Sequence, residues 1–439
     1  MKKNKITLSV CLTVVLVICI ASIWLRFIQP SVLNSNDSVT ELSQTRSNLP
    51  VKKENSRQST KRLDLENSVN SENGSAGIDT PNNTQQIEIS AQAAEILSGM
   101  TLDEKIWQMF FVTPESLTGV SNVIQAGETT QKALELQPVG GVIYFKNNIK
   151  TSEQLIEMLS TTQSYSEIPL FLGVDEEGGR VVRVSGNTDM DLPQIPPMLE
   201  VGDIGDVEYA QKIGEVVGAY LYSYGFNVDF APVADIVTNS KNTEIGDRSF
   251  SSDPIIASKM VAAFTNGLHN ENMASVLKHF PGHGSTQNDS HNGYSESMRT
   301  LDEMRDSDFA PFISGIDAGA EFVLVSHMSA INVDSSALPA SLSKIIITDI
   351  LRSELGFEGI VITDSLEMGA ITNQYSSGES AVLAIEAGVD MLLIPAQMTL
   401  AFSALKDAVM SGRLSEARID KSVTRIINTK LNMSLFKTQ

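Results

Sequence analysis

The chain has 439 residues, and its 53 acidic and 32 basic residues give a formal net charge of −21 at pH 7. This balance argues against nucleic-acid binding, which needs clustered basic side chains, and it is compatible with a soluble exported domain. The chain has 2 cysteines, Cys11 and Cys19, and both lie in an apolar N-terminal run, so the remainder of the chain forms no disulfide bonds.

The N-terminus has the pattern of a membrane anchor. Lysines in Met1–Lys5 precede Ile6–Leu25, an almost unbroken apolar run of about the length that spans a bilayer. These lysines, with only Arg26 directly after the run, favour an N-terminus that stays in the cytoplasm. Because no A-x-A cleavage site follows, residues 1–28 are predicted to be an uncleaved signal-anchor in a bacterial cell membrane, with the rest of the chain outside the cytoplasm.

Residues 29–88 differ in composition from the segments on either side. They are rich in Ser, Asn, Thr, Glu and Lys, and they show no sustained period of two or 3.6 residues. Such a segment is predicted to be a disordered linker that holds a folded domain some tens of Å from the membrane. Residues 89–439 are then long enough for one large α/β domain.

In residues 89–439, short apolar runs alternate with longer amphipathic segments, which indicates strands alternating with helices. The predicted strands are Phe110–Val112, Gly141–Phe145, Leu170–Val174, Asn227–Phe230, Ser275–Lys278, Phe322–Val325, Gly359–Thr363 and Met391–Ile394. The predicted helical segments are Ala91–Leu97, Leu102–Met109, Glu153–Tyr165, Val207–Tyr224, Pro254–His269, Leu342–Leu355, Ser380–Ala387 and Ala401–Leu431. This alternation predicts a (β/α)8 barrel. A doubly wound open sheet is the alternative, weakened because no Gly-rich phosphate fingerprint follows an early strand.

Residues 277–291, LKHFPGHGSTQNDSH, carry the densest chemistry of the chain. They hold three of its 5 histidines, and Pro281, Gly282 and Gly284 break regular structure between them. An aspartate two residues before a histidine in such a loop can present its carboxylate to one ring nitrogen. Asp289 would then fix the tautomer of His291, whose other ring nitrogen faces a substrate.

Two other interpretations of this segment stay open. One is a metal site, because His279, His283, Asp289 and His291 are all residue types that bind zinc. Their spacing is not that of a helical HExxH motif, since the proline and glycine after the first histidine would break a helix. The other is a polar loop whose histidines have no function.

The barrel prediction also requires functional groups just beyond the carboxyl ends of strands. Charged groups do follow five of the predicted strands: Asp175, Glu176, Glu177, Arg180 and Arg183; Asp235 and Arg248; Lys278 and His279; His327; and Asp364. Simpler roles exist for some of them, namely a solvated face for Glu176 and Glu177, a rim ion pair for Arg180 and a helix cap for Asp235 and Asp364. For His327, structural and functional roles are equally compatible with the sequence.

The block Lys278–Gly284, followed by Asp289-Ser290-His291, resembles the signature of family 3 glycoside hydrolases that act as β-N-acetylglucosaminidases. With the other strand-end residues, the resemblance covers roughly residues 90–430. It implies that His291 is the general acid/base with Asp289 as its dyad partner, and that Asp364 is the catalytic nucleophile. It also implies that N-acetylglucosamine is bound in the first subsite by Asp175, Arg183, Arg248, Lys278 and His279.

The resemblance therefore implies a retaining exo-β-N-acetylglucosaminidase that works by double displacement without a cofactor. No second C-terminal domain of the kind found in larger family members follows, so we expect the barrel to act alone, as a monomer. With the predicted anchor, this suggests peptidoglycan fragments or related glycans as substrates. The alternatives are a family 3 β-glucosidase, transfer of the sugar to phosphate, and an inactive sugar-binding barrel.

Overall fold

The structure, a computed structural model, describes residues 83–286 and 295–436. The predicted anchor within residues 1–28, most of the predicted linker, Asp289 and His291 lie outside these residues. In the two described stretches, no helix has the length and apolar character needed to cross a membrane.

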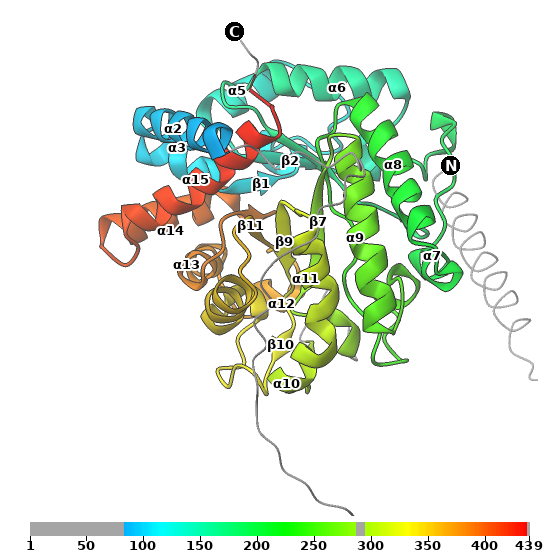
Figure 1. The fold of residues 1–439 in the computed structure, drawn as a ribbon. Coiled ribbons are helices and arrows are strands. Elements are labelled where there is room, and N and C mark those ends of the chain that lie inside the picture. The colour runs from blue at the N-terminus through cyan, green and yellow to red at the C-terminus, as the bar shows by residue number, and fades with distance from the viewer. Residues whose placement is uncertain (1–82, 287–294, 437–439) are drawn as a thin grey trace, which may run out of the picture. The chain divides into compact units, whose positions relative to one another are not determined.

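Within the described residues, the main sheet consists of eight parallel strands that form a nearly closed barrel (Figure 1). The strands are β1 (Phe110–Val112), β2 (Gly141–Tyr144), β3 (Phe171–Val174), β6 (Val228–Asp229), β7 (Ala274–Phe280), β9 (Phe322–Val325), β11 (Ile360–Thr363) and β12 (Leu392–Leu393). Neighbours in the sheet follow chain order, and β12 pairs with β1. A parallel bridge between Ile362 and Met391 joins the last two strands. The predicted barrel is confirmed, and the alternative of an open doubly wound sheet is wrong.

Helical segments connect the strands and cover the outside of the barrel. The α-helices are α2 (Asn83–Gly99), α3 (Leu102–Gln108), α4 (Pro114–Thr118), α5 (Glu128–Leu136), α6 (Ser152–Ser164), α7 (Met198–Ile204), α8 (Val207–Tyr224), α9 (Pro254–Asn270), α10 (Leu301–Glu303), α11 (Phe309–Asp317), α12 (Gly369–Thr372), α13 (Ser377–Ala387), α14 (Met398–Met410) and α15 (Glu416–Asn432). Two π-helices, η5 (Met304–Asp308) and η7 (Ile345–Glu354), complete the outer layer.

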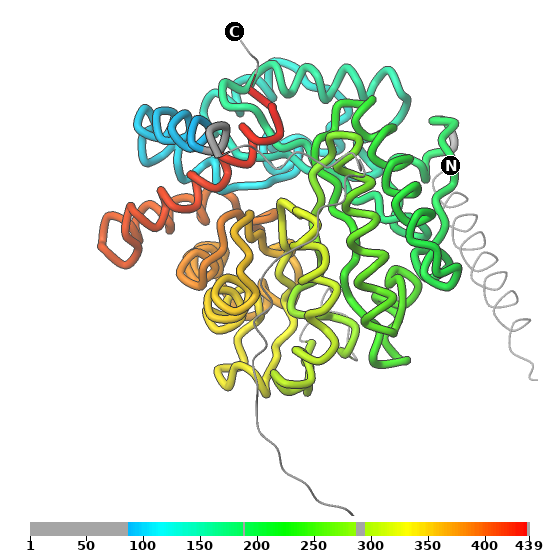
Figure 2. The backbone as a smooth tube through the Cα atoms, viewed as in Figure 1, coloured from blue at the N-terminus to red at the C-terminus, as the bar shows by residue number. Residues whose placement is uncertain are grey.

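The predicted final helix over residues 401–431 is in fact two helices. Gly412 has a φ of 79°, in the left-handed region, and follows the end of α14. Ser415 then caps α15, because its side chain accepts a hydrogen bond from Arg418 N. Both helices pack against the first helices of the domain, α14 against α3 and α15 against α2 and α3. Figure 2 shows this meeting of the first and last described segments, drawn blue and red.

The apolar sequence of the strands is explained by burial on both faces of the sheet. Every residue of β1, β2, β3, β9 and β11 is buried, which explains why these strands are continuous apolar runs. Aromatic rings fill the barrel: Phe111 packs edge-on against Phe230 with ring centroids 5.3 Å apart, and Phe171 packs against Phe322 at 5.1 Å. Gly173 makes room for them, because a Cβ there would lie 2.7 Å from the Phe230 ring.

Short elements at the carboxyl ends of the strands shape the mouth of the barrel. A hairpin of β4 (Glu176–Gly178) and β5 (Val181–Val182) follows β3. A second small sheet pairs β8 (Glu296–Ser297) with β10 (Ser329–Ala330). Short 3₁₀ turns lie here as well, η3 (Gly246–Arg248) after β6 and η4 (His283–Ser285) after β7.

Candidate active site

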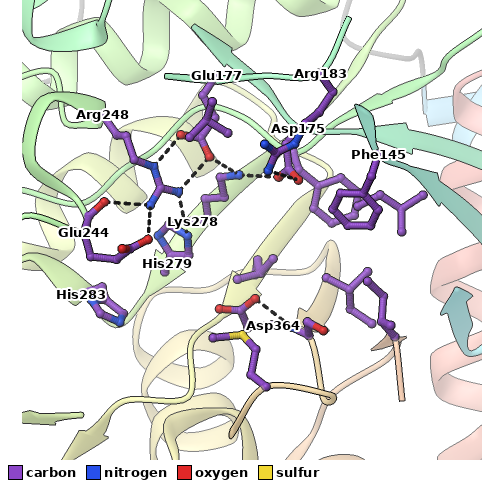
Figure 3. A pocket seen from close by; sticks show the side chains of 18 of the residues that line it. Phe145, Asp175, Glu177, Arg183, Glu244, Arg248, Lys278, His279, His283 and Asp364 are labelled. Carbon is purple, nitrogen blue, oxygen red and sulfur yellow. Dashed lines mark hydrogen bonds and ion pairs between the residues drawn. The ribbon is translucent and has the colours of Figure 1, made fainter. Parts of the chain in front are cut away.

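A pocket of about 310 Å³ opens at the carboxyl ends of the barrel strands, a volume at the low end for small-molecule sites. The predicted site residues that the structure describes all line it: Asp175, Arg183, Arg248, Lys278, His279 and Asp364. Their side chains are drawn in Figure 3. Asp364 lies across the cavity from the charged wall, which consists of Asp175, Glu177, Arg183 and Lys278. The two remaining predicted residues, Asp289 and His291, lie outside the described residues.

Lys278, at the end of β7, holds two carboxylates of the charged wall together. Its Nζ lies 2.8 Å from Asp175 Oδ1 and 2.5 Å from Glu177 Oε1 (Figure 3). Burial opposes the charge of the ammonium group, but the two carboxylates outweigh this effect and raise the pKa of Lys278. The ammonium therefore stays charged in the pocket wall, and it fixes both carboxylates in place.

Arg183 reaches the same wall from the hairpin after β3. Its Nη2 lies 3.6 Å from Asp175 Oδ2, and its guanidinium carbon lies 5.8 Å from the centre of the Phe145 ring. The buried Nε of Arg183 has no hydrogen-bond acceptor within residues 83–286 and 295–436. A buried donor without a partner is costly, so this N–H is suited to a ligand.

Arg248 differs from Arg183, because all five of its N–H groups have acceptors within the protein. Nε and Nη2 bind the Glu177 carboxylate at 2.7 and 2.8 Å, and Nη2 also lies 3.3 Å from His279 Nε2. Nη1 donates to the carbonyl of Glu244 at 3.1 Å and to its carboxylate at 3.5 Å. The long contact with the Glu244 carboxylate is the weakest of these, so Nη1 is the group that can most readily donate a hydrogen bond to a ligand instead.

The turn after β7 is built around Asp235, which is buried and does not cap a helix as one interpretation of the sequence had it. Its Oδ2 accepts hydrogen bonds from His279 N at 3.0 Å and His279 Nδ1 at 2.7 Å, and its Oδ1 accepts one from His283 N at 2.6 Å. The glycines of the motif permit this turn. Gly282 has a φ of 127°, and a Cβ at Gly284 would lie 1.9 Å from Ile236 O.

Asp364 lies directly beyond the last residue of β11, on the opposite side of the pocket from Lys278. Its Oδ1 accepts a hydrogen bond from Ser365 N at 2.8 Å. His327 contacts Ser365, the residue after Asp364, because its Nε2 lies 2.9 Å from Ser365 O. Its Nδ1 lies 2.7 Å from Ser341 Oγ. Both ring nitrogens of the buried His327 thus face protein partners, which fits a structural role.

The suggestion that Glu176 and Glu177 form a solvated face is wrong, because both are buried. Glu176 accepts hydrogen bonds from the backbone N–H groups of Arg183, Val184 and Ser185 at 2.7, 2.8 and 2.8 Å, which fixes the hairpin that carries Arg183. At Glu177, burial opposes ionisation, but Arg248 and Lys278 outweigh it and hold the pKa well below its usual range. The rim ion pair expected of Arg180 is confirmed, with Asp247 at 3.0 Å.

Three further pocket residues were not expected as site residues from the sequence: Phe145, Glu244 and Glu367. Phe145 is the last residue of a predicted strand, so the strand-end argument applied to the other residues could have found it. Burial raises the pKa of the Glu367 carboxyl. Among the described residues, no group of three or more His, Cys, Asp or Glu side chains is arranged to hold a metal ion.

Three comparisons relate this architecture to known proteins. Residues 101–429 match the model of the glycosyl hydrolase family 3 N terminal domain. Beta-hexosaminidase A of Pseudoalteromonas piscicida is 32% identical over 329 residues, which cover 67% of this chain and 54% of that protein. Beta-hexosaminidase of Nitrosomonas eutropha is 35% identical over 273 residues, which cover 61% of this chain and 76% of that protein.

Among solved structures, a glycoside hydrolase family 3 β-N-acetylglucosaminidase from Paenibacillus sp. str. FPU-7 matches with a TM-score of 0.73 and 33% sequence identity. The match covers 78% of this chain and 64% of that one. The chain thus spans 54% of the length of the first relative and 64% of this structure.

Proposed function

The chain belongs to glycosyl hydrolase family 3, and on this premise we propose that it is a retaining exo-β-N-acetylglucosaminidase. The observation that carries the proposal is the pair of opposed walls in one pocket. A carboxylate, that of Asp364, faces the cavity from one side, and the wall of Asp175, Arg183 and Lys278 faces it from the other (Figure 3). Retaining hydrolysis needs such a carboxylate beneath the anomeric carbon of a firmly held sugar.

In the proposed mechanism, a carboxylate oxygen of Asp364 attacks the anomeric carbon while the glycosidic C–O bond breaks. The leaving oxygen takes a proton from the imidazolium of His291, whose charge Asp289 supports. Water, deprotonated by His291, then attacks the same carbon and releases Asp364, so the configuration is retained. The roles of His291 and Asp289 rest on the sequence motif.

The sugar itself would be held by hydrogen bonds from the charged wall. Asp175 and Arg183 suit sugar hydroxyls best, since Asp175 is an acceptor at the pocket surface and the Nε–H of Arg183 has no partner among the described residues. Lys278 and His279 complete the proposed first subsite together with Arg248. The small volume of the pocket favours one terminal sugar, and hence exo action.

We further propose that the enzyme acts as a monomer, anchored in the bacterial membrane with its barrel outside the cytoplasm. Its substrates there would be peptidoglycan fragments or other glycans that end in N-acetylglucosamine. The apolar run Ile6–Leu25 and the polar segment of residues 29–88 support this placement.

The test compares turnover of an aryl β-N-acetylglucosaminide and the matching aryl β-glucoside by the purified full chain. We expect strong preference for the N-acetyl sugar and indifference to a chelator. Preference for the glucoside would make the protein a β-glucosidase, and chelator sensitivity would support the metal-site interpretation. A further arm adds phosphate, because an imidazole acid/base repels an anionic acceptor less than a carboxylate does. Formation of a sugar phosphate would identify transfer as the reaction.

The acid/base assignment has its own test in His291→Ala. The variant should lose far more activity with a poorly leaving alcohol than with an activated phenol, which needs little protonation. Equal losses with both substrates would contradict the role of His291.

A further inference from the structure

Asp235 lies behind the pocket wall, where it is 1% exposed, and it is not among the residues that line the cavity. Its carboxylate nevertheless meets three donors of the motif turn: His279 N at 3.0 Å, His279 Nδ1 at 2.7 Å and His283 N at 2.6 Å. A single buried carboxylate therefore holds both the ring of His279 and the start of η4.

The neighbours of His279 together determine which ring nitrogen carries its proton. Arg248 Nη2 can only donate, and it lies 3.3 Å from His279 Nε2, so Nε2 must be the unprotonated acceptor. The ring proton then lies on Nδ1 and is donated to Asp235 Oδ2. A doubly protonated ring would set an N–H against an N–H and place a positive charge beside the guanidinium.

We propose that Asp235 is a positioning residue of the sugar site, which keeps His279 in the neutral Nδ1–H tautomer so that Nε2 holds Arg248. Through this chain, Asp235 orients the guanidinium that clamps Glu177, and Glu177 in turn binds Lys278. The effect on sugar binding rests on the proposed function, whereas the tautomer is a property of the protein alone.

A second buried aspartate gives a matched control. Asp229 lies in β6 and accepts a hydrogen bond from Glu176 N at 3.0 Å, while its Oδ2 has no partner within the described part of the chain. Burial raises the pKa of the Asp229 carboxyl well above its usual value. At Asp235, burial also opposes ionisation, but the hydrogen bonds that the carboxylate accepts from His279 and from His283 N favour its ionised form, and its pKa is lowered. Asp229→Asn therefore replaces a second buried carboxyl, whose described hydrogen bond is to Glu176 N and not to the chain from Asp235 to Arg248.

The first experiment reads the tautomer directly. Nitrogen-15 chemical shifts of labelled histidine in the wild-type full chain, with His279→Gln used for assignment, distinguish a protonated nitrogen from an acceptor nitrogen. We expect a protonated Nδ1 and an unprotonated Nε2 at neutral pH. An Nε2–H tautomer or a doubly protonated ring would overturn the proposal, whatever the enzyme hydrolyses.

The second experiment measures binding of N-acetylglucosamine by calorimetry. An Asn at position 235 offers one acceptor oxygen and one NH₂ group, so it cannot accept from all three donors. We expect Asp235→Asn to weaken binding about tenfold, the effect of one lost hydrogen bond, and Asp229→Asn to change it less than about twofold. Equal effects of the two variants would show that Asp235 has no special connection to the site.

A double-variant cycle separates positioning from general support of the fold. If Asp235 acts through His279, adding Asp235→Asn to His279→Ala should weaken binding much less than it does in the wild type. If the double variant instead lost binding by the product of the two single-variant losses, the proposal would be refuted. If the wild type bound no N-acetylglucosamine, the proposed function would fail, while the tautomer measurement would still decide the role of Asp235.

Discussion

The two ends of the barrel each bury a lysine, and the pKa values of these two lysines are shifted in opposite directions. Lys278 lies at the mouth and Lys430 at the foot, where the strands begin, and they are 3% and 0% exposed. The carboxylates of Asp175 and Glu177 overcome burial and raise the pKa of Lys278. Burial alone acts on Lys430, whose pKa is well below the usual value. Its described contacts are Gln108 Oε1 at 2.8 Å and the Phe171 ring at 4.9 Å.

The foot also contains buried ion pairs, but they serve the packing of helices. Asp390 is fully buried and meets three arginines, Arg352, Arg418 and Arg425, of which Arg425 lies at 3.3 Å. Arg418 also donates to the carbonyls of Ile385 and Val389 around the end of α13. Its hydrogen bonds thus tie α13 and α15 together.

The difference between the ends shows which feature marks a candidate site. Buried charges and shifted pKa values occur at both ends, so neither identifies function by itself. At the mouth, Arg183 keeps an unpartnered Nε–H among the described residues, and its side chain lines a cavity. Unused hydrogen-bonding capacity beside a cavity is therefore the more specific signal.

The largest expected effect is the loss of the proposed nucleophile at the mouth. Asp364→Ala should lower kcat by about 10⁴-fold or more, because the covalent step disappears. Azide should restore turnover by entering the vacated space, and the product should be the inverted α-glycosyl azide. Thermal unfolding serves as the control and should stay close to that of the wild type. Full activity of the variant would remove Asp364 from the mechanism.

The second effect belongs to the foot and should leave catalysis intact. Asp390→Asn removes the buried carboxylate that three partly buried arginines share, and breaking a buried pair typically costs about 3–5 kcal/mol of unfolding free energy. We expect this loss in chemical denaturation, with KM unchanged. Glu358→Gln is the control, since this carboxylate is 85% exposed and pairs loosely with Arg425 at 3.7 Å. A changed KM in Asp390→Asn would mean that the two ends are coupled.

The third prediction concerns the pH dependence of stability at the foot. Because the pKa of Lys430 is lowered in the folded protein, the unfolded chain binds more protons up to a pH of about 10.4, and stability rises with pH in that window. The Lys430→Met variant should lack this rise of stability with pH. The stability of the variant relative to the wild type should therefore fall between pH 7 and 9.5, by at most about 1.4 kcal/mol per pH unit.

The control for Lys430 is Lys421→Met, an exposed lysine of the same helix, α15. Its stability relative to the wild type should stay flat over this pH range. A flat difference for Lys430→Met as well would mean that Lys430 keeps its proton in the folded state, and the contrast with Lys278 would disappear.

The sequence predicts the barrel well, because its strands are buried on both faces and appear as continuous apolar runs such as Ile360–Thr363. It predicts which residues stand at strand ends, and hence that Asp175, Lys278 and Asp364 share a pocket. The burial of Glu177 could not be predicted, because its partner Arg248 is 71 residues away in the chain. The same holds for Asp235, whose role depends on a turn 44 residues later. Such pairings are set by the tertiary fold.

The smallest predicted effect refines the contrast between Arg183 and Arg248. Arg248 Nη1 contacts the Glu244 carboxylate at 3.5 Å, in the place where a sugar hydroxyl would have to bind. If Glu244 competes with the sugar, Glu244→Ala should lower KM for the aryl N-acetylglucosaminide by about threefold, the effect of losing one weak ion pair, with little change in kcat. Glu367→Gln, a second carboxylate of the pocket, is the matched control. A raised KM in Glu244→Ala would instead make Glu244 a sugar ligand, and Arg248 would then orient this carboxylate without binding the sugar itself.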